Sequence, residues 1–189
     1  MQQHPDLLTD RLLLTPPSQS DLEDITAQIN STEEIPRNIF NIPNPYTLAD
    51  AENWLAICHE GWKSGSAFRF ALRDKRSGRF IGMIGLHPVN EHRKAEVGYW
   101  LGKEFHGRGY AGEALMAVLR FGFETLDLNK IFATHFTQNP ASGKVMEKAG
   151  MKHEGFLKQE YYHQNEFQDV HRYCILKSQW QPVSLKGKD

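Results

Sequence analysis

The sequence predicts a mixed α/β fold of the α+β type, in which about four helices flank a mostly antiparallel sheet of about seven strands. Three observations support this fold class. Apolar segments joined by turn-rich stretches fill residues 67–101, which is typical of hairpins. Strand and helix patterns alternate over residues 110–150, as they do where helices cover a sheet. The clearest helical pattern, at 110–126, repeats apolar residues with the spacing of one helix face.

The N-terminal third is predicted to hold one strand and two helices. Ser20 is the expected N-cap of the first helix, whose acidic first turn suits the helix dipole. Thr47 and Gly65 are the expected caps of the second helix. In chain order, these elements are a strand at Leu12–Leu14, a helix at 21–30, a Pro- and Asn-rich loop at 35–46 and a helix at 48–63.

The rest of the chain is predicted to alternate between strands and helices. A turn at 74–79 and another at Gln164-Asn165 join neighbouring strands into hairpins. The expected elements are strands at 67–73, 80–87 and 95–101, a helix at 110–126, a strand at 131–136, a helix from Asn139 to Gly150, and strands at 153–162 and 167–176.

Length and charge exclude several classes of protein. A chain of 189 residues is most simply one domain, with a core at about 8–177 and a C-terminal tail at 178–189. Its 22 Lys+Arg and 23 Asp+Glu residues give a formal net charge of −1. Because there is no overall basic field, nucleic acid is not an expected partner.

Neither a metal site nor a membrane segment is predicted. Cys58 and Cys174 form no CxxC pair, and the nine histidines show no HExxH spacing. The first residues lack the apolar run of a signal peptide. The longest nearly apolar run, Phe80–Leu86, is far shorter than the ~20 residues that span a bilayer. We therefore expect a cytoplasmic protein without a bound metal.

A glycine-rich loop is the most informative motif. Gly107, Gly109 and Gly112 stand between a predicted strand and the long helix. Glycine lets a backbone turn sharply and approach a ligand closely, and a helix N-terminus offers free N–H groups and a positive dipole end. Lys103 and Arg108 add positive charge beside the loop. The motif therefore predicts a site for a phosphate-bearing ligand.

Two classes of ligand fit such a loop. The spacing from Gly107 to Gly112 formally matches the dinucleotide fingerprint, but the following strand ends at Phe136-Thr137 without the acid that would bind a ribose. A Walker A loop is excluded because no Gly-Lys-Ser/Thr follows. The other ligand class is coenzyme A.

At this loop the chain resembles the GNAT superfamily of acetyl-CoA-dependent N-acyltransferases, and most closely its RimJ/RimL-like branch. The pyrophosphate loop of that family, Gln/Arg-x-x-Gly-x-Gly/Ala, corresponds to residues 106–111, with His106 at its first position. The resemblance covers about residues 8–177. Its further motifs are Glu96–Leu101, Asn139–Ser142, Glu147–Gly150, Glu154–Phe156 and Asp169–Tyr173.

The resemblance implies that acetyl-CoA is the co-substrate. In the family, backbone N–H groups of the loop bind the pyrophosphate, and the pantetheine arm lies along the fourth strand where it splays from the fifth. The residues assigned to the cofactor in this way are Val97, Gly98, Tyr99, His106, Gly107, Arg108, Gly109, Tyr110, Ala111, Asn139 and Ser142. Asn139 also suits a helix N-cap before Pro140.

Acyl transfer to an amine needs a base for the amine, donors for the oxyanion and a proton for the thiolate. The resemblance makes Glu96 the candidate base, acting through water, and Glu160 a second candidate. The alternative for Glu96 is a solvated strand residue paired with Arg93 or Lys94.

The residues alone leave the proton donor for the thiolate open. Many relatives carry, at the position of Met146, a Tyr that serves as the proton donor. The RimJ/RimL-like pattern offers Ser142 instead, although Ser also simply suits a first helical turn. A thiol pKa near 8.5 lets the thiolate leave without protonation as well.

The predicted reaction is transfer of an acetyl group from acetyl-CoA to a primary amine of a protein N-terminus or a small molecule. Direct attack in a ternary complex is favoured because neither cysteine lies next to an obvious base. The alternatives are a non-catalytic CoA-binding regulatory module and, from the glycine spacing alone, a nicotinamide-dependent oxidoreductase. The protein is expected to be a monomer or a homodimer. By resemblance, the acceptor pocket includes Phe40, Trp54, Tyr161 and Tyr162.

Overall fold

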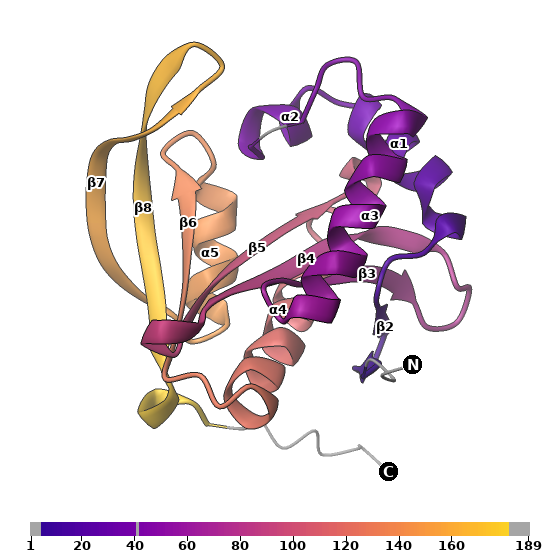
Figure 1. Cartoon of the computed structure of the whole chain (residues 1–189). Helices are drawn as coiled ribbons and strands as arrows, with labels where there is room; N and C mark the ends of the chain where they lie inside the picture. The colour runs from indigo at the N-terminus through magenta and orange to yellow at the C-terminus, as the bar shows by residue number, and fades with distance from the viewer. Residues whose placement is uncertain (1–4, 41, 182–189) are drawn as a thin grey trace.

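A single eight-stranded sheet in the order β1-β2-β3-β4-β5-β6-β8-β7 forms the centre of the molecule (Figure 1). The computed structural model describes residues 5–40 and 42–181. Every neighbouring pair of strands is antiparallel except β5 and β6, which are parallel. The strands are β1 (Leu7–Leu8), β2 (Leu12–Thr15), β3 (Phe68–Asp74), β4 (Phe80–Val89), β5 (Lys94–Leu101), β6 (Lys130–Phe136), β7 (Lys152–His163) and β8 (Glu166–Leu176).

Helices cover both faces of the sheet, each over its own apolar core. Alternate residues of one strand point to opposite faces, so Phe70 and Leu72 of β3 join the core under α4 and α5, whereas Ala71 joins the core under α1 and α3. The helices are α1 (Leu22–Asn30), α2 (Glu34–Asn38), α3 (Leu48–Ser64), α4 (Tyr110–Arg120) and α5 (Pro140–Lys148).

The parallel pair β5–β6 comes apart after three residues. Lys94–Glu96 pairs with Lys130–Phe132, and beyond this point the two strands diverge (Figure 1). Each strand stays paired along its length with its other neighbour, β5 with β4 and β6 with β8. The sheet therefore opens between two well-anchored strands, and the facing backbone edge of β5 is left for another partner.

The predicted fold class is confirmed, with one strand more than expected. The added strand is β1, only two residues long, which pairs with β2. The helix caps Thr47 and Gly65 of α3 are where they were expected, and Gly65 has a left-handed φ of 71°. The predicted turn at Gln164-Asn165 is present, with φ of 51° and 64° at these two residues.

Three details of the predicted elements are wrong. Ser18, rather than Ser20, begins the first helical segment, through a capping box with Asp21. The predicted loop at 35–46 begins inside α2, where Pro36 lies in the first turn and its missing N–H costs no hydrogen bond. The long helix ends at Arg120 and continues as a π-helical turn over Phe121–Thr125.

At the C-terminus, the packed part of the chain extends beyond the predicted core limit at residue 177. A 3₁₀ turn follows over Lys177–Gln179, and Trp180 packs against Phe123 with ring centroids 5.7 Å apart. The rest of the predicted tail, residues 182–189, lies outside the described residues. Within the described ranges, none of the helices combines the length and apolar character that crossing a bilayer requires.

Candidate active site

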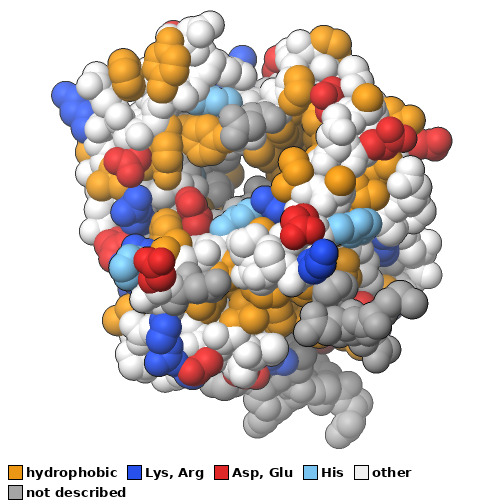
Figure 2. All heavy atoms as spheres, in the orientation of Figure 1, with side chains coloured by type: hydrophobic (Ala, Val, Ile, Leu, Met, Phe, Trp, Pro, Cys, Tyr) orange, Lys and Arg blue, Asp and Glu red, His pale blue; other side chains and the backbone are white. Residues whose placement is uncertain are grey.

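A cavity of about 620 Å³ lies at the opening between β5 and β6. Figure 2 shows this side of the molecule hollowed, with hydrophobic side chains along the walls. The residues that line the cavity come from both faces of the sheet: Ser142 belongs to α5 on one face, and Trp54 belongs to α3 on the other. The cavity therefore reaches both faces of the sheet through the opening between the strands.

The glycine loop lies at the end of the cavity that faces α4. Gly107 and Gly109 have left-handed φ values of 74° and 81°, and Gly109 is the N-cap of α4. The first hydrogen bond of the helix runs from the N–H of Glu113 to the carbonyl of Gly109. The N–H groups that precede Glu113 in the first turn therefore have no partner within the helix, which is the geometry of an anion site.

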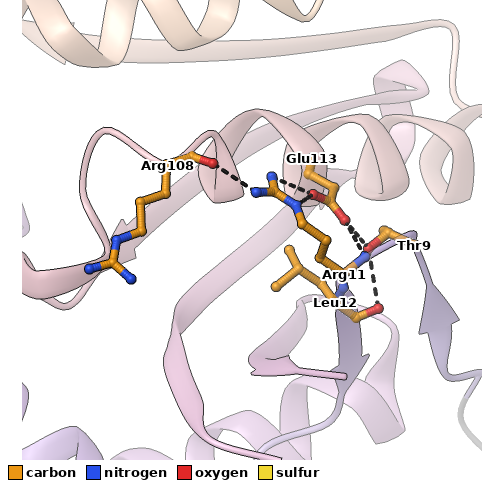
Figure 3. A network of polar contacts seen from close by, with 5 residues as sticks. All are labelled: Thr9, Arg11, Leu12, Arg108 and Glu113. Carbon is orange, nitrogen blue, oxygen red and sulfur yellow. Dashed lines mark hydrogen bonds and ion pairs between the residues drawn. The ribbon is translucent and has the colours of Figure 1, made fainter. Parts of the chain in front are cut away.

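The N-terminal hairpin holds this loop in place through Arg11 (Figure 3). Nε of Arg11 donates to a carboxylate oxygen of Glu113 at 2.7 Å, and Nη1 donates to the carbonyl of Arg108 at 2.9 Å. Thr9 donates its hydroxyl to the other carboxylate oxygen at 2.6 Å. The pKa of Glu113 is lower than its ordinary value. Partial burial alone would raise it, but the hydrogen bonds from Thr9 and Arg11 have the larger combined effect.

Three side chains of the loop have structural contacts of their own. The ring of Tyr110 lies under the guanidinium of Arg11, 4.5 Å from its centroid. Nε2 of His106 is 3.0 Å from the carbonyl of Leu101. The side chain of Arg108 points away from the Arg11 network (Figure 3). Of the predicted loop residues, His106, Gly107 and Ala111 line the cavity, whereas Arg108, Gly109 and Tyr110 do not.

On the same face, Tyr99 reaches from β5 to the first turn of α5. Its hydroxyl is 2.9 Å from Oγ of Ser142 and donates to the carbonyl of Ser142 at 3.1 Å. Burial raises the pKa of Tyr99 to about 12, so the phenol stays protonated at neutral pH. Asn139 caps α5 by accepting from the N–H of Ser142 at 3.3 Å. Met146 is buried and lines the cavity.

Glu96 lies on the opposite face, at the last paired position before the strands separate. Its carboxylate accepts a hydrogen bond from Oγ1 of Thr134 at 3.2 Å. Burial raises the pKa of Glu96 above its ordinary value, although Thr134 and the charge of Arg172 act in the opposite direction. The alternative of a pair with Arg93 does not occur, because Arg93 pairs with Asp127 instead.

Glu160, the second candidate base, has another environment. Its carboxylate pairs with the guanidinium of Arg172 at 3.3 Å, and it is not among the residues that line the cavity. The guanidinium of Arg172 also lies over the ring of Phe132, 5.2 Å from its centroid. This pair leaves Glu160 less available to a ligand than Glu96.

Three of the four predicted acceptor residues line the cavity, namely Phe40, Trp54 and Tyr161. Phe40 packs against Tyr161 with ring centroids 4.7 Å apart. The fourth, Tyr162, is 64 % exposed and packs on Phe167 instead. Neighbouring residues of a strand point to opposite faces, so Tyr161 and Tyr162 cannot both face the cavity.

Three polar residues on the strands of the acceptor side were not predicted from the sequence: Arg69, His87 and Thr134. Each lies on a predicted strand at a position that faces the same side as Glu96. His87 is the direct cross-strand neighbour of Glu96. Burial and, to a smaller extent, the charge of Arg69 lower the pKa of His87 to about 4, so its imidazole is neutral at pH 7. A polar residue within a largely apolar strand is the signal that was available.

Within the part of the chain that the structure describes, no three His, Cys, Asp or Glu side chains are grouped so that they could hold a metal ion. The cavity itself combines two features. An opening in a sheet beside free helix N–H groups is typical of a protein that binds a phosphate-bearing cofactor.

Known proteins with this arrangement identify the class. Residues 11–152 match the family model "Acetyltransferase (GNAT) domain". The chain is 32 % identical to the uncharacterized N-acetyltransferase YoaA of Bacillus subtilis, over 92 % of this chain and 97 % of YoaA. It is 28 % identical to the [ribosomal protein uS5]-alanine N-acetyltransferase of Escherichia coli, over 68 % and 67 % of the two chains.

A solved structure agrees with these matches. The spermidine N-acetyltransferase of Vibrio cholerae, in complex with CoA and spermine, superposes with a TM-score of 0.76 at 27 % identity, covering 90 % of this chain and 98 % of that one. The protein belongs to the GNAT acetyltransferase family, within its RimJ/RimL-like branch. It is an acetyl-CoA-dependent N-acetyltransferase, as the sequence motifs predict. The same matches argue against a nicotinamide-dependent oxidoreductase and against a purely regulatory CoA-binding module.

Proposed function

We propose that this protein transfers the acetyl group to the primary amine of a protein N-terminus or of a small molecule, by direct attack within a ternary complex. Relatives named for a ribosomal-protein alanine and for spermidine support both acceptor classes. Direct attack is supported by the two cysteines. Burial raises the pKa of Cys58 to about 12 and also raises that of Cys174, so neither is a ready thiolate nucleophile.

The cofactor would enter from the face of α4 and α5. The N–H groups at 107–111 would bind its pyrophosphate, with positive charge from Arg108 nearby. The pantetheine arm would follow the open edge of β5, where Val97 and Gly98 supply backbone groups beside Tyr99. The side-chain N–H₂ of Asn139 remains a donor for an amide of the arm, because only its oxygen caps the helix.

The observation that carries the proposal is the position of Glu96 at the opening of the sheet, hydrogen-bonded to Thr134. Glu96 would take a proton from the acceptor ammonium, directly or through one water, and the free amine would attack the thioester carbonyl. The tetrahedral intermediate would then collapse, breaking the C–S bond and releasing the CoA thiolate. Ser142, held against Tyr99, would relay the second proton of the attacking nitrogen to that thiolate, so that its own hydroxyl is restored.

Two variants test this assignment as a matched pair. Replacing a catalytic base costs about 10²–10⁴-fold in rate, so Glu96→Gln should lower kcat by at least about 100-fold and leave the Kd of CoA unchanged. Glu160→Gln removes the same charge outside the cavity and should stay within a few-fold of the wild-type kcat. The assignment is wrong if the two variants exchange these results, or if both retain full turnover.

The remaining features of the proposal concern the whole chain. The protein would act in the cytoplasm as a monomer or a homodimer, without a nucleic-acid or membrane partner, and residues 1–189 would form one domain. The neutral net charge supports the absence of a nucleic-acid partner. Light scattering on the purified protein would decide between the monomer and the homodimer.

A further inference from the structure

The acceptor side of the cavity contains a cation that the proposed transfer reaction does not use. Arg69 of β3 lines the cavity together with His87 and Glu96. Among the described residues, no carboxylate lies within ion-pair distance of its guanidinium. Its interaction partner is the thiol of Cys58, which stays protonated at neutral pH. A half-buried guanidinium without a counter-charge is costly unless a ligand supplies one.

Cross-strand register puts this cation in the same row as the reaction centre. Arg69 pairs with Gly85 and Gly85 pairs with Gly98, so the three positions cross β3, β4 and β5 side by side. Two strand spacings separate the backbones of Arg69 and Gly98, which is about 10 Å. The space over Gly98 is open and makes a floor for a ligand, whereas side chains cover the neighbouring Gly85.

The side chains beside this open position lie over Gly85. A Cβ at this position would lie 3.1 Å from Nε2 of His87 and 3.3 Å from Cγ of Arg69, so both side chains lean over the glycine. From there Arg69 extends beneath α3, where Nη1 would be 3.4 Å from a Cβ on Gly61. Trp54, Cys58 and Gly61 follow the i, i+4, i+7 spacing of one helix stripe. The guanidinium therefore lies at the deep, α3-covered end of the acceptor side.

The charges of the acceptor side are thus separated. Glu96 lies at the opening of the sheet, where the amine of the acceptor has to be deprotonated, and Glu34 lies beside the glycine loop, 3.9 Å from Nδ1 of His106. Arg69 lies at the other end, and His87 between them is neutral at pH 7. An ammonium group suits the end near Glu96, whereas an anionic group suits the end near Arg69.

From this arrangement we infer that the natural acceptor is a primary amine that also carries a carboxylate or another anion, and that Arg69 is the residue that selects it. The inference rests on the proposed acetyl transfer and specifies its substrate class. It covers an acidic N-terminal peptide and a small amino-carboxylic acid. It disfavours polycationic amines, because a second ammonium group would be placed against the guanidinium.

The test uses acceptor pairs that differ only in charge: tripeptide amides with Asp or Asn at the second position, and the α-amides of glutamate and of glutamine, in which the side-chain carboxylate of glutamate is the one anionic group. Spermidine serves as the polycation. Initial rates are followed by release of the CoA thiol, for wild type, Arg69→Met and Arg69→Lys. Met matches the length of the Arg stem without its charge, and Lys keeps the charge. The backbone carbonyl of Arg69, which accepts from Nε1 of Trp62, is unaffected by either change.

The inference predicts that wild type has at least a tenfold higher kcat/KM for the anionic member of a pair. This ratio should fall to near one in Arg69→Met and persist in Arg69→Lys, while the Kd of CoA and the melting temperature stay close to wild type. A wild-type ratio of one or less, or an unchanged ratio in Arg69→Met, would overturn it. A complete absence of transfer to every amine would instead overturn the proposed function, and this inference with it.

Discussion

Arg11 and Glu113, 102 residues apart in the sequence, form an ion pair in which both Nε and Nη2 of Arg11 lie 2.7 Å from the same carboxylate oxygen. The backbone N–H of Arg11 donates to the other oxygen at 2.8 Å. This contact ties the short N-terminal hairpin to the first turn of α4, directly beside the glycine loop. The loop is thus supported from outside the cavity, and its geometry depends on a residue that does not line it.

Replacing Arg11 by Met should therefore weaken cofactor binding without touching the cofactor. Hydrogen bonds to charged groups contribute about 1.5–3 kcal/mol to the free energy of unfolding. Arg11 is half exposed, so we expect its replacement to lower the free energy of unfolding by about 1 kcal/mol. The melting temperature should fall by about 2–4 °C, and a loss of similar size in the free energy of CoA binding, from the unsupported loop, would raise the Kd about fivefold. Calorimetric titration and thermal melting measure both. Arg76→Met, in the exposed turn between β3 and β4, is the control, and an equal effect in both variants would contradict the idea.

The stability that Glu113 provides should depend on pH in a definite direction. Its pKa is below the ordinary carboxyl value of 4.5, so the stabilisation is fully present above the pKa of the unfolded chain. It is lost as the pH falls through the lower pKa of the folded state. The difference in melting temperature between wild type and Glu113→Gln should therefore be constant near neutral pH and shrink below about pH 4.5. A difference that grows on acidification would disagree with this.

Two glycines of the cofactor loop should respond oppositely to Ala. Gly107 has a φ of 74°, where a Cβ costs about 1–2 kcal/mol, and its replacement would also deform the anion site. Gly112 lies inside α4 with open space where a Cβ would lie, so Gly112→Ala should be neutral or stabilising by up to about 1 kcal/mol. Chemical denaturation and CoA titration of both variants distinguish the two positions. Equal destabilisation by both substitutions would contradict the assigned backbone roles.

Thr134 should set the acidic limb of the activity profile. Burial raises the pKa of Glu96, and the hydrogen bond that the hydroxyl of Thr134 donates to its carboxylate acts in the opposite direction. Thr134→Val keeps the shape of the side chain and removes that donor, so the pKa of Glu96 should rise further. Because the base must be ionised, the acidic limb of kcat/KM should move to higher pH. Thr134→Ser restores the hydroxyl and should restore the limb, whereas a limb that stays fixed in Thr134→Val would exclude Glu96 as the group that it reports.

Local sequence rules accounted for elements whose signals lie within a few residues. The α3 helix is bounded by Thr47 and Gly65 because a side-chain cap and a left-handed C-cap both act within one turn. At α2 the predicted loop is wrong. Pro36 lies in the first turn of this helix, a position with which proline is compatible. The Ser18–Asp21 capping box was also visible as a local pattern and explains why Ser20 was the wrong choice.

Periodicity and short motifs were sufficient to predict the order of elements, the glycine loop before α4, the family and Glu96 as the candidate base, because these signals act along the chain. Other properties could be seen only in the folded chain. They are the separation of β5 from β6 after Glu96, the pair of Glu160 with Arg172 outside the cavity, and the position of Arg69 across Gly85 without a counter-charge. These depend on strand register and on contacts between segments far apart in sequence, which no local pattern encodes.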